Sequence, residues 1–99
     1  MNTDGVDVAC LVDGVETDHL PVTDSTVVRG YGCFEAIRSY QGRLFRLDDH
    51  IDRLVRSAAA LGITVPDRRL LTFWITKVTE DRGDCVVRVI LSAGAAVPG

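Results

Sequence analysis

The segment "RGYGCFEAIRSY", residues 29–40, decides the fold of this chain. Its residues 33–40 alternate with a period of two, which is typical of a β-strand whose two faces meet different surroundings. The dipeptide Gln41-Gly42 then predicts a chain reversal into "RLFRL", residues 43–47. We therefore expect a β-hairpin whose first strand is entered through two glycines, with an arginine near each end of the quoted segment.

A second hairpin and a returning strand accompany this one. The apolar run "DVACLV", residues 7–12, is closed by Asp13-Gly14, which supplies positive φ at hairpin turns, and this hairpin should end near Pro21. The polar stretch "VTDST" that follows is expected to be a turn. Residues 85–92, "CVVRVILS", predict a buried strand interrupted by one charge.

Two helices are predicted between the second hairpin and the last strand. A first helix runs from an Asp48 cap to Leu61, and an Asp67 cap begins a second helix with Arg82 in its last turn. A glycine follows each helix, as is common at helix ends. The stripes expected to face the core are Ile51, Leu54, Val55, Ala58 and Leu61 in the first helix, and Leu71, Trp74, Ile75 and Val78 in the second.

These elements predict an α+β fold, an antiparallel sheet of hairpins covered by two helices. We expect the domain to occupy residues 1–94, and we read residues 95–99 as the start of an interdomain linker. A chain of 99 residues buries roughly 60 to 65% of its unfolded surface, so its stability would gain from further domains or subunits.

Composition narrows the function classes. The net charge of −3 lacks the basic footprint of a nucleic-acid binder. No apolar run approaches the ~20 residues that cross a bilayer, and the first residues lack the features of a signal peptide, so we expect no membrane partner. The three cysteines, Cys10, Cys33 and Cys85, are odd in number and lie in apolar sequence, which favours reduced thiols and a cytoplasmic location.

Several cationic side chains could bind an anion. His50, Arg53 and Ser57 lie three and four residues apart on the edge of the first helix, where Arg53 could bind a phosphate or carboxylate or be an ordinary surface arginine. His50 is read as a capping or packing histidine. Arg88 lies in apolar sequence and needs an anionic partner, either an internal carboxylate such as Glu35 or the carboxylate of a ligand.

The quoted segment offers further candidates. Arg29 precedes two glycines and could project from a loop toward a site, although turn chemistry explains the glycines equally well. Phe34, Arg38 and Tyr40 share one strand face, which is either a ligand wall or a half-exposed sheet surface. Zinc-ligand spacing, a P-loop, a nucleotide fingerprint and a nucleophile elbow are all missing from the sequence, so no metal site is predicted.

Four stretches carry a resemblance to a known family: "RGYGCFEAIR", "GRLF", "DDHIDRLVRSAAALGI" and "VVRVILSAG". Over residues 7–94 the chain resembles the small N-terminal domain of class IV aminotransferases, the fold-type IV pyridoxal phosphate enzymes. This family includes D-amino-acid transaminases, branched-chain aminotransferases and aminodeoxychorismate lyases. The resemblance implies pyridoxal 5'-phosphate as cofactor, amino acids and 2-oxo acids as substrates, and a homodimer.

The resemblance also implies residue roles. The arginine of the family's "HxxRL" helix binds the cofactor phosphate, and this position is Arg53. Phe34 and Arg38 match positions that line the substrate pocket, and Arg88 matches an arginine on the substrate side. Arg29 lies in a segment that reaches the neighbouring subunit's active site.

Two departures bear on the substrate. Tyr31 replaces the acid of the common "GDG", and Ala93 stands where many D-amino-acid enzymes carry an arginine. Arg29 and Arg88 could substitute by converging on one carboxylate. This chain looks most like a less common D-amino-acid transaminase subgroup with "RGYG"-like loops, acting on a D-amino acid and 2-oxoglutarate.

The resemblance places the catalytic Schiff-base lysine in a large domain absent from this chain. Lys77, the single lysine here, does not correspond to it, so we expect these residues alone to be inactive. The alternatives are a branched-chain L-amino-acid aminotransferase or aminodeoxychorismate lyase of the same family, or a non-catalytic anion-binding module.

Overall fold

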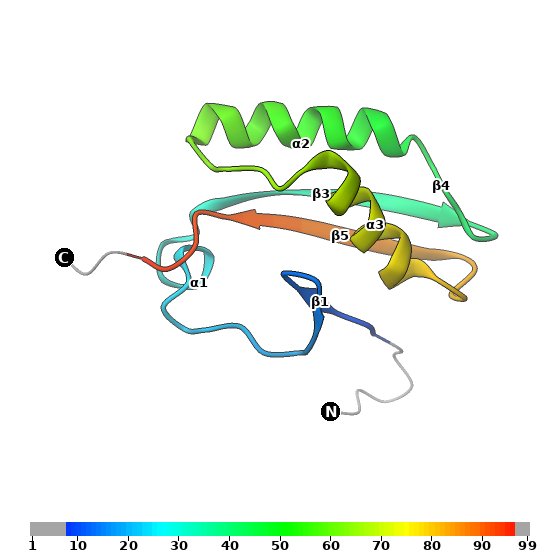
Figure 1. Ribbon diagram of the computed structural model, residues 1–99, viewed down its shortest axis with the longest axis horizontal. Helices are drawn as coiled ribbons and strands as arrows, with labels where there is room; N and C mark the ends of the chain where they lie inside the picture. Colours follow the sequence, from blue (N-terminus) through cyan, green and yellow to red (C-terminus); the bar gives the residue numbers. More distant parts are fainter. Residues whose placement is uncertain (1–7, 97–99) are drawn as a thin grey trace.

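A computed structural model describes residues 8–96 and has one long antiparallel strand pair at its centre (Figure 1). Strand β3 (Gly32–Tyr40) pairs with β5 (Cys85–Ser92) in a continuous register from Gly32↔Ser92 to Ser39↔Cys85. The short strand β4 (Arg43–Leu44) pairs with the last two residues of β3, so the sheet order is β4-β3-β5. The predicted α+β fold with an antiparallel sheet is confirmed.

The two faces of this sheet differ as the period-two pattern predicts. On β3, Glu35, Ile37 and Ser39 are buried, whereas the residues between them are exposed. Direct partners in an antiparallel pair share a face, so Val89 of β5 joins Glu35 on the inner face. The open face carries Phe34, Ala36, Arg38 and Tyr40 from β3 and Val86, Arg88 and Ile90 from β5.

Two helices cover the inner face, α2 (Leu47–Leu61) over β3 and α3 (Arg68–Thr79) over β5 (Figure 1). Their apolar stripes meet the inner-face residues of the strands in a single cluster. The buried hydrophobic residues of this core are Ile37, Ile51, Leu54, Ala58, Ile63, Leu71, Ile75, Val89 and Leu91. Because the helices lie on one side only, the open face has no layer over it within residues 8–96.

The helix boundaries correct several predictions. Helix α2 begins at Leu47 after Arg46, which has a left-handed backbone with φ 55° and makes no side-chain cap, so Asp48 lies in the first turn and is not the cap. In the first turn, the Asp48 carboxylate still interacts favourably with the positive end of the helix dipole. Val55 and Leu61 are exposed, contrary to the predicted stripe.

Helix α3 has the predicted start and an earlier end. Asp67 accepts hydrogen bonds from the backbone N–H groups of Arg69 and Leu70, which confirms the predicted cap. The helix ends at Thr79, so Arg82 lies beyond its last turn.

A short helix, α1 (Ser25–Arg29), occupies part of the segment expected to be a turn. Asp24 caps it by accepting from the backbone N–H of Thr26, and Gly30 ends it with φ 62°. The Ser92 hydroxyl donates to Asp24 Oδ1 at 2.6 Å, and the Ser25 hydroxyl donates to the Gly94 carbonyl at 2.6 Å. These bonds attach α1 to the end of β5.

The N-terminal hairpin is confirmed but short, with β1 (Leu11–Val12) and β2 (Val15–Glu16) joined by the predicted Asp13-Gly14 turn. It forms a separate two-stranded sheet. The turn packs on α3 so closely that a Cβ at Gly14 would lie 2.5 Å from Trp74 Nε1. Residue 7, also assigned to this strand, lies outside the described residues.

The cysteines and the helices bear on two further expectations. The three cysteines are free thiols, but Cys10 is exposed, which corrects the prediction that all three lie in apolar surroundings. None of the helices in the described part of the chain has the length and apolar character required to span a bilayer.

We predict that Leu54→Ala lowers the free energy of unfolding by about 2–4 kcal/mol, because it leaves a cavity where a side chain of 1% exposure packed. Leu61→Ala, on the same helix at 38% exposure, is the matched control and should cost about 1 kcal/mol or less. Urea unfolding of both variants measures the difference. Equal losses would contradict the placement of the core.

Candidate functional site

A buried carboxylate with two cationic partners lies between β3 and α2. Glu35 on β3 is 9% exposed and accepts hydrogen bonds from Arg53 of α2, whose Nε lies 3.1 Å from both carboxylate oxygens and whose Nη2 lies 2.9 Å from Oε1. Nδ1 of His50 lies 2.8 Å from the same Oε1. We call Glu35, His50 and Arg53 the Glu35 cluster.

Strand alternation in β3 and helical spacing in α2 bring the residues of this cluster together. Alternation along β3 turns Glu35 inward, beneath α2. His50 and Arg53 are three residues apart on α2, so they lie on the same helix face one above the other. The edge of β3 beside the cluster has no strand partner in the described chain before Ser39, because β4 pairs only with the last two residues. The cluster therefore lies at an accessible edge of the sheet.

Hydrogen bonds from Arg53 lower the pKa of the Glu35 carboxyl, and burial, which alone would raise that pKa, does not offset them. His50 lowers the same pKa further. The Glu35 carboxylate raises the pKa of the Arg53 guanidinium in return. Glu35 is therefore held ionised, as a buried carboxylate must be when it is paired.

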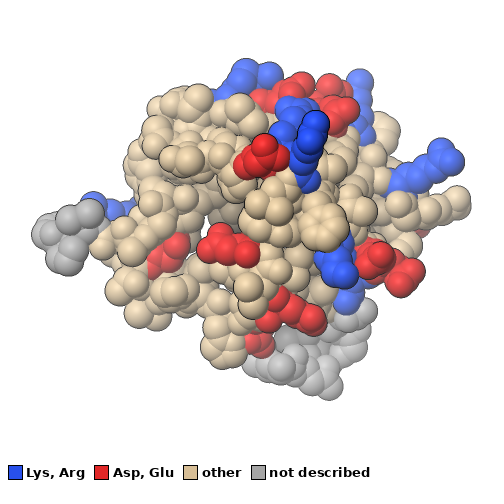
Figure 2. All heavy atoms as spheres, viewed as in Figure 1, with Lys and Arg blue, Asp and Glu red and all other residues tan. Residues whose placement is uncertain are grey.

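The Arg53 side chain binds the buried Glu35 on one side and is exposed to solvent on the other. Its Nε and Nη2 hold Glu35, whereas Nη1 takes no part in those bonds, and the side chain is 60% exposed. It borders a depression of about 410 Å³ along α2, lined by Arg46, Asp49, His50, Asp52, Arg53 and Arg56. Figure 2 shows acidic and basic side chains interspersed over α2, at the top of the molecule.

The two aspartates of this depression have arginine partners other than Arg53. Asp49 pairs with Arg46 at 3.5 Å, and Asp52 pairs at 2.8 Å with Arg68 at the start of α3. With three arginines and two paired carboxylates, the depression can accept an anion at the outward edge of Arg53.

The predicted aromatic wall lies on the open face of the sheet. Phe34 and Tyr40 are 58% and 49% exposed, and each has an arginine over its ring. The guanidinium of Arg88 lies 5.3 Å from the Phe34 ring centre, and that of Arg38 lies 5.4 Å from the Tyr40 ring centre. These contacts hold both cations against aromatic rings.

The exposure of Arg88 differs from the prediction. Its apolar neighbours in sequence suggested a buried guanidinium, but β5 alternates in burial and Arg88 falls on the exposed face, opposite Ala36. Glu35, the proposed internal partner, points to the other face and pairs with Arg53. Of the two partners considered for Arg88, the internal carboxylate Glu35 is therefore wrong, because the strand register separates the two faces.

Arg29 is the last residue of α1 and is exposed, which corrects its placement in a loop. Each of the two glycines that follow, Gly30 and Gly32, is needed for a different structural reason. Gly30 ends α1 with a positive φ, and a Cβ at Gly32 would lie 2.6 Å from Thr26 Cγ2 and 2.8 Å from the Leu91 carbonyl oxygen. Since Arg88 pairs with Ala36, it lies about 13 Å along the strand from Gly32, so only extended side chains would let Arg29 and Arg88 meet.

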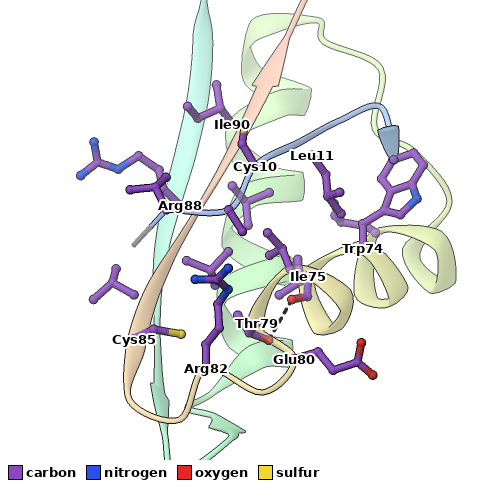
Figure 3. Close-up of a pocket in the computed structure, with 18 of the residues that line it drawn as sticks. Cys10, Leu11, Trp74, Ile75, Thr79, Glu80, Arg82, Cys85, Arg88 and Ile90 are labelled. Atoms are coloured by element: carbon purple, nitrogen blue, oxygen red, sulfur yellow. Dashed lines mark hydrogen bonds between the residues drawn. The ribbon is translucent and has the colours of Figure 1, made fainter. Parts of the chain in front are cut away.

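A larger hollow, of about 800 Å³, lies between the N-terminal hairpin, α3 and β5. Figure 3 shows Trp74, Ile75 and Thr79 of α3 on one side of it and Arg88 on the far side of β5. Of the predicted site residues, Arg88 alone borders this hollow. His50 and Arg53 do not border this hollow and line the depression along α2 instead.

Comparison with known proteins points to one family. The family model for amino-transferase class IV matches residues 32–98. The chain is 37% identical over 91 residues to a chloroplastic D-amino-acid transaminase of Arabidopsis thaliana, covering 85% of this chain and 24% of that protein.

Solved structures that are similar to the chain include a lyase and an aminotransferase. One is 4-amino-4-deoxychorismate lyase from Pseudomonas aeruginosa, at TM-score 0.79 and 28% identity over 88% of this chain and 32% of that one. The other is a branched-chain aminotransferase from Thermoproteus uzoniensis, at TM-score 0.71 and 27% identity over 84% and 32%. The chain thus spans a quarter to a third of the length of the proteins it matches.

We predict a pH-dependent contribution of Glu35 to stability. Its pKa is lower in the folded chain than in the unfolded one, so its stabilisation is fully present above the ordinary glutamate pKa of 4.5 and is lost as pH falls through the lower folded value. Glu35→Gln should therefore cost about 2 kcal/mol at pH 7 and less at pH 3. Urea unfolding of both proteins across this range tests it, and a constant difference would contradict it.

Proposed function

Because the chain belongs to the class IV aminotransferase family, we propose that it forms the N-terminal part of a pyridoxal 5'-phosphate-dependent transaminase. We assign the cofactor phosphate to Arg53, and the amino acid and 2-oxo acid substrates to the open face of the sheet. A second, larger domain would follow residues 1–94 and carry the catalytic lysine, with residues 95–99 leading into it.

One observation carries this proposal: Arg53 is held by Glu35 on one edge of its guanidinium and remains exposed on the other. A phosphate needs donors fixed in direction, and a guanidinium fork supplies them. The depression beside Arg53 also contains Arg46 and Arg56, so its charge suits the phosphate end of the cofactor. The residues present therefore fit that end of the group.

Strand alternation at the free edge of β3 supports the substrate assignment. Glu35 and Phe34 are neighbours in the chain, so they point to opposite faces of the sheet. A ligand that crosses this edge would meet Arg53 on the helix side, and Phe34 with Arg88 on the open side. When bound, pyridoxal phosphate supplies the electron-accepting ring that stabilises negative charge at the substrate Cα.

Within this arrangement, Arg88 and Arg29 would bind the substrate α-carboxylate, and Phe34 with Arg38 would form the pocket wall. The Arg88–Phe34 contact supports the first role, because it holds the cation beside an exposed aromatic surface. Charge-assisted bonds from two guanidinium groups would orient the substrate and select for a carboxylate.

We propose a D-amino acid and 2-oxoglutarate as the substrate pair. The Arabidopsis D-amino-acid transaminase supports this choice at 37% identity. The similar structures named above favour two alternatives, a branched-chain aminotransferase and an aminodeoxychorismate lyase.

We also propose a homodimer in the cytoplasm. Val27 and Val28 of α1 are 53% and 54% exposed beside Arg29, and an apolar surface of this kind is suited to contact with a second subunit. Arg29 would then reach the partner's site. The three free thiols support a reducing compartment.

Arg53→Ala should weaken binding of pyridoxal 5'-phosphate to the full-length apoprotein by about 10- to 100-fold, because it removes charge-assisted bonds to the phosphate. Arg69→Ala, an exposed arginine on α3, is the matched control and should leave the affinity unchanged. Equilibrium titration followed by absorbance measures both. An unchanged affinity in Arg53→Ala would refute the phosphate assignment.

Arg88→Ala should raise the KM of the full-length enzyme for its amino acid about tenfold, because the variant loses a carboxylate contact. The assay uses D-alanine, D-glutamate and L-leucine with 2-oxoglutarate, and aminodeoxychorismate separately. Turnover of L-leucine or aminodeoxychorismate alone would replace the D-amino-acid proposal by the corresponding alternative. Unchanged kinetics in Arg88→Ala would show that the carboxylate binds elsewhere.

A further inference from the structure

We propose that Glu35 is a positioning residue that fixes the direction of the Arg53 guanidinium for phosphate binding, with His50 holding Glu35 in turn. This inference rests on the proposed role of Arg53 at the cofactor phosphate. It gives a function to a buried carboxylate that would not itself touch the cofactor.

The hydrogen bonds of the cluster restrict Arg53 strongly. Two nitrogens of its planar group, Nε and Nη2, are held by one carboxylate at 2.9–3.1 Å, and bonds at two points fix the plane as well as the position. A solvent-exposed arginine without such a partner samples many rotamers and loses that freedom when it binds a ligand. Glu35 imposes much of this order before the ligand arrives.

The carboxylate is itself immobilised. Glu35 is on β3, where it pairs with Val89 of β5, its side chain is 10% exposed, and His50 Nδ1 lies 2.8 Å from Oε1. The His50 side chain is 17% exposed, so this contact is also shielded from water. Arg53 is thus attached to the rigid part of the domain although most of its own side chain is exposed.

Positioning and simple electrostatics make opposite predictions. Glu35 carries a negative charge next to Arg53, so if charge alone mattered, its removal would strengthen the binding of an anion. If Glu35 acts by orienting the guanidinium, its removal weakens binding. A variant of Asp49 separates the two effects. The Asp49 carboxylate raises the pKa of Arg53 through its charge, but its ion pair is with Arg46.

The experiment uses the full-length apoprotein and two probes, pyridoxal 5'-phosphate and pyridoxal, which lacks the phosphate. The ratio of their dissociation constants isolates the phosphate contribution. We expect Glu35→Gln to reduce this preference for the phosphorylated probe about tenfold and His50→Ala to reduce it about threefold. Asp49→Asn should leave the preference unchanged or increase it.

A double variant tests whether Glu35 acts through Arg53. In the Arg53→Ala background, Glu35→Gln should have no further effect on the preference, because the group it orients is gone. An equal loss of affinity for both probes in Glu35→Gln would indicate a merely structural role and overturn the proposal, as would an increased preference for the phosphorylated probe.

The outcomes also separate this inference from the proposed function. If Arg53→Ala leaves the preference intact, the phosphate assignment itself fails. If Arg53→Ala abolishes the preference and Glu35→Gln does not change it, the phosphate assignment stands and the positioning role is wrong. Far-UV circular dichroism reports whether each variant folds, and should Glu35→Gln fail to fold, an unchanged preference in His50→Ala overturns the proposal.

Discussion

The antiparallel register between β3 and β5 is the constraint on which the rest of the chain depends. Its alternation turns Glu35 toward the helices and Phe34 toward the open face, and a slip of one residue would exchange them. The buried Ile37, Val89 and Leu91 fix this register, because a slip would expose them. The same pairing that forms the core therefore assigns each candidate side chain to its face.

The inward turn of Glu35 creates a requirement that α2 meets. A buried carboxylate without partners is strongly destabilising, so His50 and Arg53 serve the fold whether or not a ligand is present. The same bonds leave Arg53 ordered and exposed at the free edge of β3. The bonds that satisfy the buried Glu35 are thus the same ones that would orient Arg53 in its proposed role.

Local rules predicted the elements that depend on local chemistry. The Asp13-Gly14 turn, the Asp67 cap and the alternation of residues 33–40 follow from the preferences of a few adjacent residues, and all three are confirmed. The helix α1 had such a signal, an Asp24 cap with Gly30 after the last turn, but its five residues carry too little periodicity to be recognised. The Asp48 cap was wrong because the left-handed Arg46 is the cap position, two residues earlier, and α2 begins at Leu47.

By itself, the sequence determined the α+β class, most elements and the candidate cations, because residue type and spacing encode periodicity and charge. Only the tertiary structure decided which arginine pairs with Glu35 and that Arg88 lies over Phe34 on an exposed face. Those contacts join residues distant in sequence, and their distances depend on strand register and on where α2 crosses the sheet. A pattern along one segment carries no information about either.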